Sequence, residues 1–220
     1  MNVFDIIGPI MVGPSSSHTA GAVRIGQIAR VVAGGKPVAV TIELYGSFAQ
    51  TYKGHGTDKA IIAGLLGMAP DDQRIKDSLA LAGQAGMSFK FRKSSNQAVH
   101  PNTALISAVD QLGKKTIVQG SSVGGGRIVV NRINEINVKF KGDYYTLLIP
   151  HTDTPGVIAA VTKLLADHGI NIAELNMYRS HRGGEAMMVI ETDQAVKAEV
   201  VSLIEAVKTV KKAVLIEPIY

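Results

Sequence analysis

The order of hydrophobic patterns along residues 144–219 is the feature that most limits the fold of this chain. Short β-rich runs occur at 144–149, 170–178, 186–191 and 213–219. Between them lie two segments whose apolar residues have helical spacing: Val157, Val161, Leu164 and Leu165 in the first, and Val196, Val200, Leu203, Ile204 and Val207 in the second. A polar turn with Gly183-Gly184 makes the two central strands a hairpin. The order βαββαβ predicts a ferredoxin-like split βαβ domain.

The first 142 residues have a less regular pattern, which predicts a mixed α+β domain. Helical spacing is found around residues 22–32, from Thr57 to Leu66, and around 75–82. Alternating apolar residues predict strands at 38–44, 87–91 and 128–140. The stretch 102–121 favours a β-hairpin that turns at Gly113-Lys114, although a helix is also compatible with it. The whole chain is therefore expected to be α+β, with domains 1–142 and 143–220 that meet at Lys141-Gly142-Asp143.

Cysteine is absent from all 220 residues. The chain therefore has no disulfide bonds and no cysteine nucleophile. It also lacks the thiolates that normally hold an iron–sulfur cluster, so any such cluster would sit on another chain. The shares of hydrophobic residues, 46%, and charged residues, 19%, are those of a folded, soluble protein.

Neither a membrane nor a nucleic acid is an expected partner. The first five residues lack the basic region of a signal peptide, and no apolar run reaches the ~18–20 residues needed to span a bilayer. A cytoplasmic location follows. The net charge is +5, but the basic residues are scattered apart from pairs such as Lys114-Lys115 and Lys211-Lys212. Without aromatic residues or a binding motif beside them, these charges favour a solvated surface or an acidic partner over nucleic acid.

Residues 13–19, G-P-S-S-S-H-T, form the most unusual run of the sequence. A serine or threonine here can cap the helix that follows, but capping accounts for only one hydroxyl. Several hydroxyls and free backbone N–H groups at a helix start are suited to binding a carboxylate. His18 adds a group that can gain or lose a proton near neutral pH. Because Ser17 and His18 are adjacent, Ser–His nucleophilic hydrolysis is disfavoured, and no G-x-S-x-G turn is present.

Three further polar runs precede or follow expected elements: G-H-G-T-D at 54–58, H-P-N-T at 100–103 and S-S-V-G-G-G at 121–126. Each has a simple alternative explanation. A loop histidine is commonly a solvated surface group, and three glycines commonly form a hinge or bulge. They can equally serve a site, because glycine lets the backbone approach a ligand closely.

Taken in this order and with these separations, the four runs resemble the serine dehydratase beta domain. With no cysteine-bearing catalytic domain attached, the chain resembles the separate beta chain of the two-chain, iron–sulfur-dependent bacterial L-serine dehydratase. The allosteric substrate-binding domain of some D-3-phosphoglycerate dehydrogenases is related to this domain. The alternative function is therefore a non-catalytic, amino-acid-binding regulatory subunit.

The resemblance implies an L-serine ammonia-lyase that is active only with its alpha chain and makes pyruvate and ammonia. It implies a 4Fe–4S cluster on the alpha chain, which acts as a Lewis acid on the β-hydroxyl of L-serine, and no pyridoxal phosphate. His18 and His55 would make the catalytic polar contacts. The implied substrate-binding residues are Ser15, Ser16, Ser17, Thr19, His100 and Asn102. The base that removes the α-proton can belong to either chain.

The C-terminal domain resembles an ACT domain through D-T-P-G-V-I at 153–158 and I-N-I-A-E-L at 170–175. This resemblance implies self-association and binding of a small amino acid. The implied effector-binding residues are Asp153, Pro155, Gly156, Val157, Asn171 and Ile172. Independently of the resemblance, the loop ends at a helix start, whose free N–H groups suit a carboxylate. The alternative is a purely structural turn, with Pro155 at the first helical position and Gly156 easing the turn.

Overall fold

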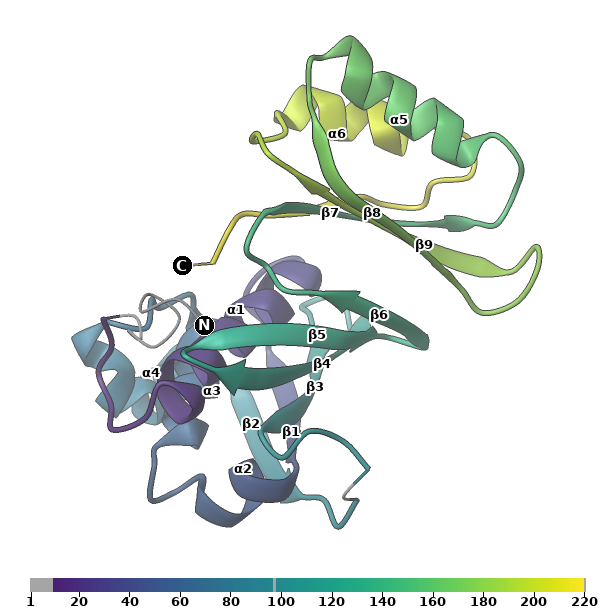
Figure 1. Ribbon diagram of the computed structural model, residues 1–220. Coiled ribbons are helices and arrows are strands. Elements are labelled where there is room, and N and C mark those ends of the chain that lie inside the picture. Colours follow the sequence, from purple (N-terminus) through teal and green to yellow (C-terminus); the bar gives the residue numbers. More distant parts are fainter. Residues whose placement is uncertain (1–9, 97, 220) are drawn as a thin grey trace. The chain divides into compact units, whose positions relative to one another are not determined.

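The computed structural model describes residues 10–96 and 98–219, and the chain divides into two compact units between Asn134 and Glu135. This division falls shortly before the domain boundary expected at 141–143, which stays a prediction. Each unit contains both helices and strands, so the α+β class predicted from the sequence is confirmed (Figure 1).

The first unit contains four α-helices, two shorter helical turns and five strands among its described residues. In chain order these are η2 (Ser17–Gly21), α1 (Ala22–Val32), β1 (Ala39–Leu44), α2 (Gly46–Thr51), α3 (Thr57–Leu66), η3 (Gln73–Asp77), α4 (Ser78–Gln84), β2 (Ser88–Lys93), β3 (Thr103–Val109), β4 (Lys115–Gly124) and β5 (Arg127–Ile133). The predicted helices and the 102–121 hairpin are confirmed. The strand expected over 128–140 is interrupted at Asn134, which has a left-handed φ of 51°.

The strands of the first unit follow the order β2-β1-β3-β4-β5. Strands β1 and β2 are parallel, and the other neighbouring pairs are antiparallel. Val40, Ile42 and Leu44 of β1 are buried, whereas the residues between them are half-buried, because successive side chains of a strand point to opposite faces. Helix α1 covers the sheet, with Ile25 lying directly over Gly120 of β4.

Helices α1 and α3 pack together at two glycines. A Cβ atom on Gly26 would overlap the carbonyl oxygen of Ile61, and one on Gly64 would overlap that of Val23. The backbones therefore approach more closely than any other residue type would permit. This contact places the first turn of α1, at Val23, against the second half of α3, at Gly64.

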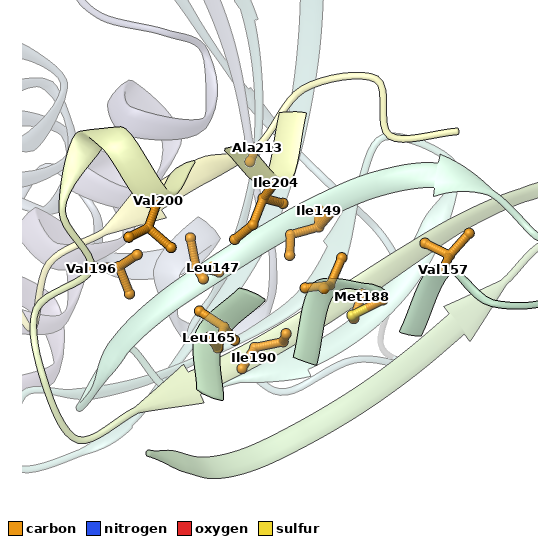
Figure 2. Packing of buried hydrophobic residues seen from close by; sticks show 11 residues of the cluster. Leu147, Ile149, Val157, Leu165, Met188, Ile190, Val196, Val200, Ile204 and Ala213 are labelled. Atoms are coloured by element: carbon orange, nitrogen blue, oxygen red, sulfur yellow. The ribbon is translucent and has the colours of Figure 1, made fainter. Parts of the chain in front are cut away.

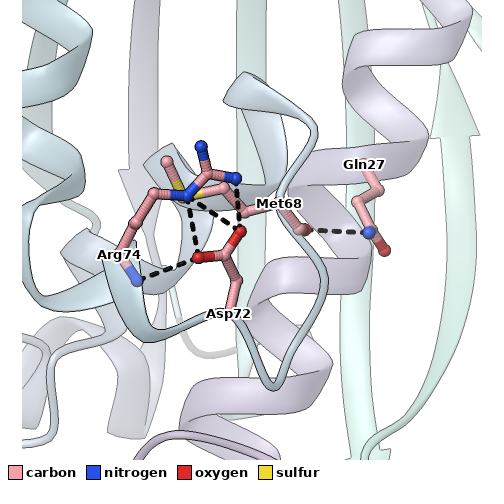
Figure 3. Close-up of polar contacts among 4 residues, drawn as sticks. All are labelled: Gln27, Met68, Asp72 and Arg74. Atoms are coloured by element: carbon pink, nitrogen blue, oxygen red, sulfur yellow. Dashed lines mark hydrogen bonds and ion pairs between the residues drawn. The ribbon is translucent and has the colours of Figure 1, made fainter.

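Two polar contacts hold the chain beyond α3 (Figure 3). The side-chain amide of Gln27 in α1 donates to the carbonyl of Met68 at 2.9 Å. Asp72 caps η3 by accepting from the backbone N–H of Arg74 at 2.9 Å, and it also pairs with the Arg74 guanidinium at 2.6 Å. The hydrogen bonds and charge of Arg74 lower the pKa of the Asp72 carboxyl.

The second unit contains the βαββαβ order predicted for the C-terminal domain. Strand β6 (Ile136–Phe140) precedes this order, which consists of β7 (Tyr145–Thr152), α5 (Val157–Asp167), β8 (Ile172–Arg179), β9 (Glu185–Thr192), α6 (Ala198–Glu205) and β10 (Val214–Ile216). Strands β10-β7-β9-β8 form an antiparallel sheet, and both helices cover one of its faces (Figure 1). The last strand is shorter than the expected 213–219, and Pro218 has no amide hydrogen with which to continue it.

The helices and sheet of the second unit bury one apolar cluster between them (Figure 2). It consists of Leu147, Ile149, Val157, Val161, Leu165, Met188, Ile190, Val196, Val200, Ile204 and Ala213. The helical residues in this cluster have the spacing that predicted α5 and α6, because residues three and four apart share one face of a helix.

The substitution Leu165→Ala is expected to lower the free energy of unfolding of the second unit by roughly 2–5 kcal/mol. Leu165 is fully buried, so its truncation leaves a cavity. Leu203→Ala is the matched control: this leucine of α6 is 43% exposed, and its loss should change stability by less than about 0.5 kcal/mol. Urea unfolding measures both values. Equal effects of the two substitutions would contradict the packing described.

Candidate active site

His18 is the centre of a cluster of hydroxyl groups in the first unit. It lies in η2 and is only 7% exposed. Its Nδ1 lies 3.3 Å from Ser15 Oγ. Its Nε2 lies 3.1 Å from Thr51 Oγ1 and 3.3 Å from Ser47 Oγ, both on α2. Both nitrogens of a buried imidazole therefore have polar partners.

Aromatic rings hold the other sides of the imidazole. The Phe48 ring lies edge-on with its centroid 5.2 Å away, and that of His55 lies nearly perpendicular at 4.6 Å. Burial, followed by the charge of His55, lowers the pKa of His18 from its ordinary value. This shift favours the neutral form of the His18 ring, whereas His55 is exposed to solvent at the turn before α3.

The serine-rich run differs from the loop expected before α1, because Ser17–Gly21 already form one π-helical turn that continues into α1. The backbone N–H of His18 donates to Ser15 Oγ at 3.4 Å, and that of Thr19 donates to the Ser15 carbonyl at 2.8 Å. Ser16 makes no side-chain cap. The three serines are half-buried, whereas Thr19 is 2% exposed with its side chain against Gly13.

The loop at 100–103 joins this cluster through α2. The backbone N–H of Phe48 donates to the Pro101 carbonyl at 3.2 Å, and Gly46 lies so close to Pro101 that a Cβ atom there would clash. His100 is exposed, and its Nδ1 accepts from the backbone N–H of Asn102 at 3.2 Å. The Asn102 side-chain oxygen is buried without a hydrogen-bond partner among the described residues, which is unusual for a buried polar group.

The run at 121–126 lies beside the serine-rich run. It was expected to be a glycine loop, but β4 continues through Gly124 and only Gly125 and Gly126 form the turn. The Ser122 N–H donates to the Asn102 carbonyl at 2.9 Å, and the Ser122 side chain lies against Gly21 of η2. All four polar runs identified in the sequence are therefore linked by direct contacts around η2 and α2.

Helix α2 is the part of the site that sequence reasoning missed. It is six residues long, too short to show a helical repeat of apolar residues, and it supplies Ser47 and Thr51. The sequence G-S-F-A-Q-T could have indicated this helix, because it places the hydroxyls of Ser47 and Thr51 four residues apart, between a predicted strand and the G-H-G run. Residues four apart share a helix face, and here that face contacts His18.

The six residues expected to bind an effector occupy two places in the second unit. Asp153 accepts hydrogen bonds from Arg179 at 2.9 Å and from the backbone N–H of Gly183 at 3.1 Å. Pro155 and Gly156 are exposed, and Val157 is buried in the apolar cluster.

Asn171 and Ile172 instead line a shallow groove with one side of α5. The Asn171 side chain donates to Asp193 at 2.6 Å. The groove does not include the loop that contains Asp153. Effector binding at either place stays a prediction.

The described residues also limit other kinds of site. Within residues 10–96 and 98–219, no group of three His, Cys, Asp or Glu side chains is placed to hold a metal ion. No helix in the same part of the chain is long and apolar enough to cross a bilayer.

The chain thus combines a hydroxyl–imidazole cluster next to a mixed sheet with a βαββαβ unit. The family model described as "Serine dehydratase beta chain" matches residues 2–86, and the ACT domain model matches residues 145–209. The chain is thus a serine dehydratase beta-type domain followed by an ACT domain.

Curated relatives define the family more narrowly. The chain is 46% identical to a probable L-serine dehydratase beta chain of Bacillus subtilis, over 88% of this chain and 87% of the relative. It is 39% identical to the L-serine dehydratase beta chain of Peptoniphilus asaccharolyticus, over 98% of both. A D-3-phosphoglycerate dehydrogenase of Bacillus subtilis is 28% identical over 72% of this chain but only 30% of its own length. The chain belongs to the L-serine dehydratase beta chain family.

Proposed function

We propose that this chain, together with a separate alpha chain, eliminates water from L-serine and yields pyruvate and ammonia. The observation that carries the proposal is the cluster around His18, because it joins a buried imidazole, whose pKa is lowered by burial, to a half-buried row of serines. Loss of water leaves an enamine, whose tautomerisation and hydrolysis release ammonia and pyruvate without further help from the protein.

The start of η2 would bind the carboxylate of L-serine. Ser16 and Ser17 are half-buried there, and the free N–H groups of a helix start carry partial positive charge that favours an anion. Thr19, which lies against Gly13, would hold the turn in shape. Fixing the carboxylate would orient the α-hydrogen for removal.

The histidines and Asn102 would surround the rest of the substrate. His18 and His55, whose rings are in contact, are proposed to make the catalytic polar contacts. His100 and Asn102 would position the substrate from the neighbouring loop. The unpartnered oxygen of Asn102 supports this role, since a ligand N–H would satisfy it.

This chain does not fit the requirements of an iron–sulfur cluster. It has no cysteine, so the 4Fe–4S cluster proposed for the enzyme would be held by cysteines of the alpha chain. When bound there, the cluster would supply a Lewis acid for the departing hydroxide, and no pyridoxal phosphate is proposed. The chain's own residues would bind and orient L-serine. We also propose self-association and amino-acid binding for the ACT domain, and a cytoplasmic location.

Reconstitution tests the proposed function. Mixed anaerobically with a cysteine-bearing L-serine dehydratase alpha chain, this chain should produce pyruvate from L-serine, and neither chain alone should do so. The D-3-phosphoglycerate dehydrogenase relative supports a regulatory alternative over part of the chain. Tight L-serine binding by the isolated chain, without any stimulation of the alpha chain, would favour that alternative and reject the lyase.

A further inference from the structure

We infer that Thr51 is a positioning residue that holds His18 in the tautomer with hydrogen on Nε2, so that Ser15 presents only lone pairs to the substrate. The inference deepens the proposed function, because it assigns Ser15 to the ammonium group of L-serine instead of the carboxylate. It rests on the hydrogen-bond directions around His18.

The first direction is set on the Nε2 side of the ring. Thr51 Oγ1 donates its only hydrogen to the carbonyl of Ser47 at 2.8 Å, one turn earlier in α2. What Thr51 offers to Nε2 at 3.1 Å is therefore a lone pair. If Nε2 also carried a lone pair, the two lone pairs would face each other and no hydrogen bond could form between Thr51 and the ring. The hydrogen of the neutral ring is therefore on Nε2. Ser47 Oγ, at 3.3 Å from Nε2, can accept as a second partner.

The second direction follows on the Nδ1 side. With hydrogen on Nε2, Nδ1 carries a lone pair and lies 3.3 Å from Ser15 Oγ. Ser15 Oγ already accepts from the backbone N–H of His18 at 3.4 Å, which uses one of its lone pairs. Its hydrogen is free to point at Nδ1. Both sides of the ring therefore agree on one neutral tautomer, and the burial that lowers the pKa of His18 favours an uncharged ring.

The consequence concerns the chemistry that Ser15 can offer. A hydroxyl whose hydrogen is committed to Nδ1 cannot donate to a carboxylate, but its remaining lone pair can accept from an N–H group. Within the serine-rich run, Ser16 and Ser17 then remain to donate to the carboxylate. Ser15 is suited to the ammonium group and thereby distinguishes an amino acid from a hydroxy acid without one.

The tautomer can be tested on the full chain without any activity. Nitrogen-15 NMR of the histidine ring distinguishes the two neutral forms, with the His18 signals assigned by their loss in His18→Gln. We expect the Nε2–H form in the wild-type chain and in Thr51→Ser, and a mixture of both forms in Thr51→Val. The matched control is Thr162→Val in α5, where the lost hydroxyl also donates to the carbonyl one turn earlier. A wild-type Nδ1–H ring, or an unchanged ring in folded Thr51→Val, overturns the inference.

The role of Ser15 is tested in the reconstituted complex by comparing two ligands. Ser15→Ala should raise the KM for L-serine about tenfold or more, because it removes an acceptor for a charged group. The inhibition constant of 3-hydroxypropionate, which has the carboxylate and hydroxyl but no amino group, should stay unchanged. Equal weakening of both ligands would place Ser15 on the carboxylate and overturn its assignment. Should the complex be inactive altogether, the proposed function fails, whereas the NMR result still decides the tautomer.

Discussion

Turnover of the reconstituted alpha–beta complex is expected to fall by at least about a hundredfold when His18 is replaced by alanine. The imidazole is nearly buried, burial lowers its pKa, and both of its nitrogens are hydrogen-bonded, so it is equipped to accept or donate a proton. Its removal also releases Ser15 and Thr51 from their present orientation. The measurement is the rate of pyruvate formation from L-serine at saturating substrate.

His168→Ala is the matched control for this substitution. His168 is exposed at the end of α5, its ring is hydrogen-bonded to the Leu164 carbonyl, and it is not part of the four polar runs, so turnover should be unchanged. Circular dichroism and the unfolding midpoint should show that both variants are folded. Normal turnover in a folded His18→Ala complex would remove His18 from the chemistry.

Gly64→Ala is expected to lower the free energy of unfolding of the first unit by about 1–3 kcal/mol or more. The added methyl group would overlap the Val23 carbonyl and crowd the backbone of Gln27 and Gly26. All of these are backbone atoms of two packed helices, so the overlap cannot be relieved by rotation of a side chain. The two helices would have to separate, which would also shift η2 and the site that begins there. Urea unfolding of the full chain measures the change.

The control for Gly64→Ala is Gly83→Ala. Gly83 is exposed in α4, and a Cβ atom there meets nothing within 4 Å. Alanine is the better helix former, so this variant should be up to about 1 kcal/mol more stable than the wild type. Opposite signs for the two glycines are the expected result. A neutral or stabilising Gly64→Ala would show that the helices do not pack at that glycine.

The second unit could be predicted from the sequence because its burial follows one simple rule. Each strand and helix buries one face against a single apolar cluster, so hydrophobic spacing reports the element type directly. In the first unit, hydrophobic spacing reports the elements and their contacts less completely. Gly26 and Gly64 make its closest helix contact, and a glycine contributes no hydrophobic signal. Helix α2 has only six residues, and Phe48 is its only large apolar side chain, so it shows no hydrophobic repeat.

The four polar runs and their chemical character were readable from the residues by themselves. Hydroxyls, imidazoles and glycines next to expected helix starts indicate a polar site, because these groups can bind a ligand or transfer a proton. The absence of cysteine likewise determined that this chain cannot supply thiolates to a cluster. Only the tertiary structure decided which hydroxyls meet His18. Thr51 and Ser47 lie 33 and 29 residues away from it along the chain, and hydrogen-bond direction depends on atoms brought together by packing.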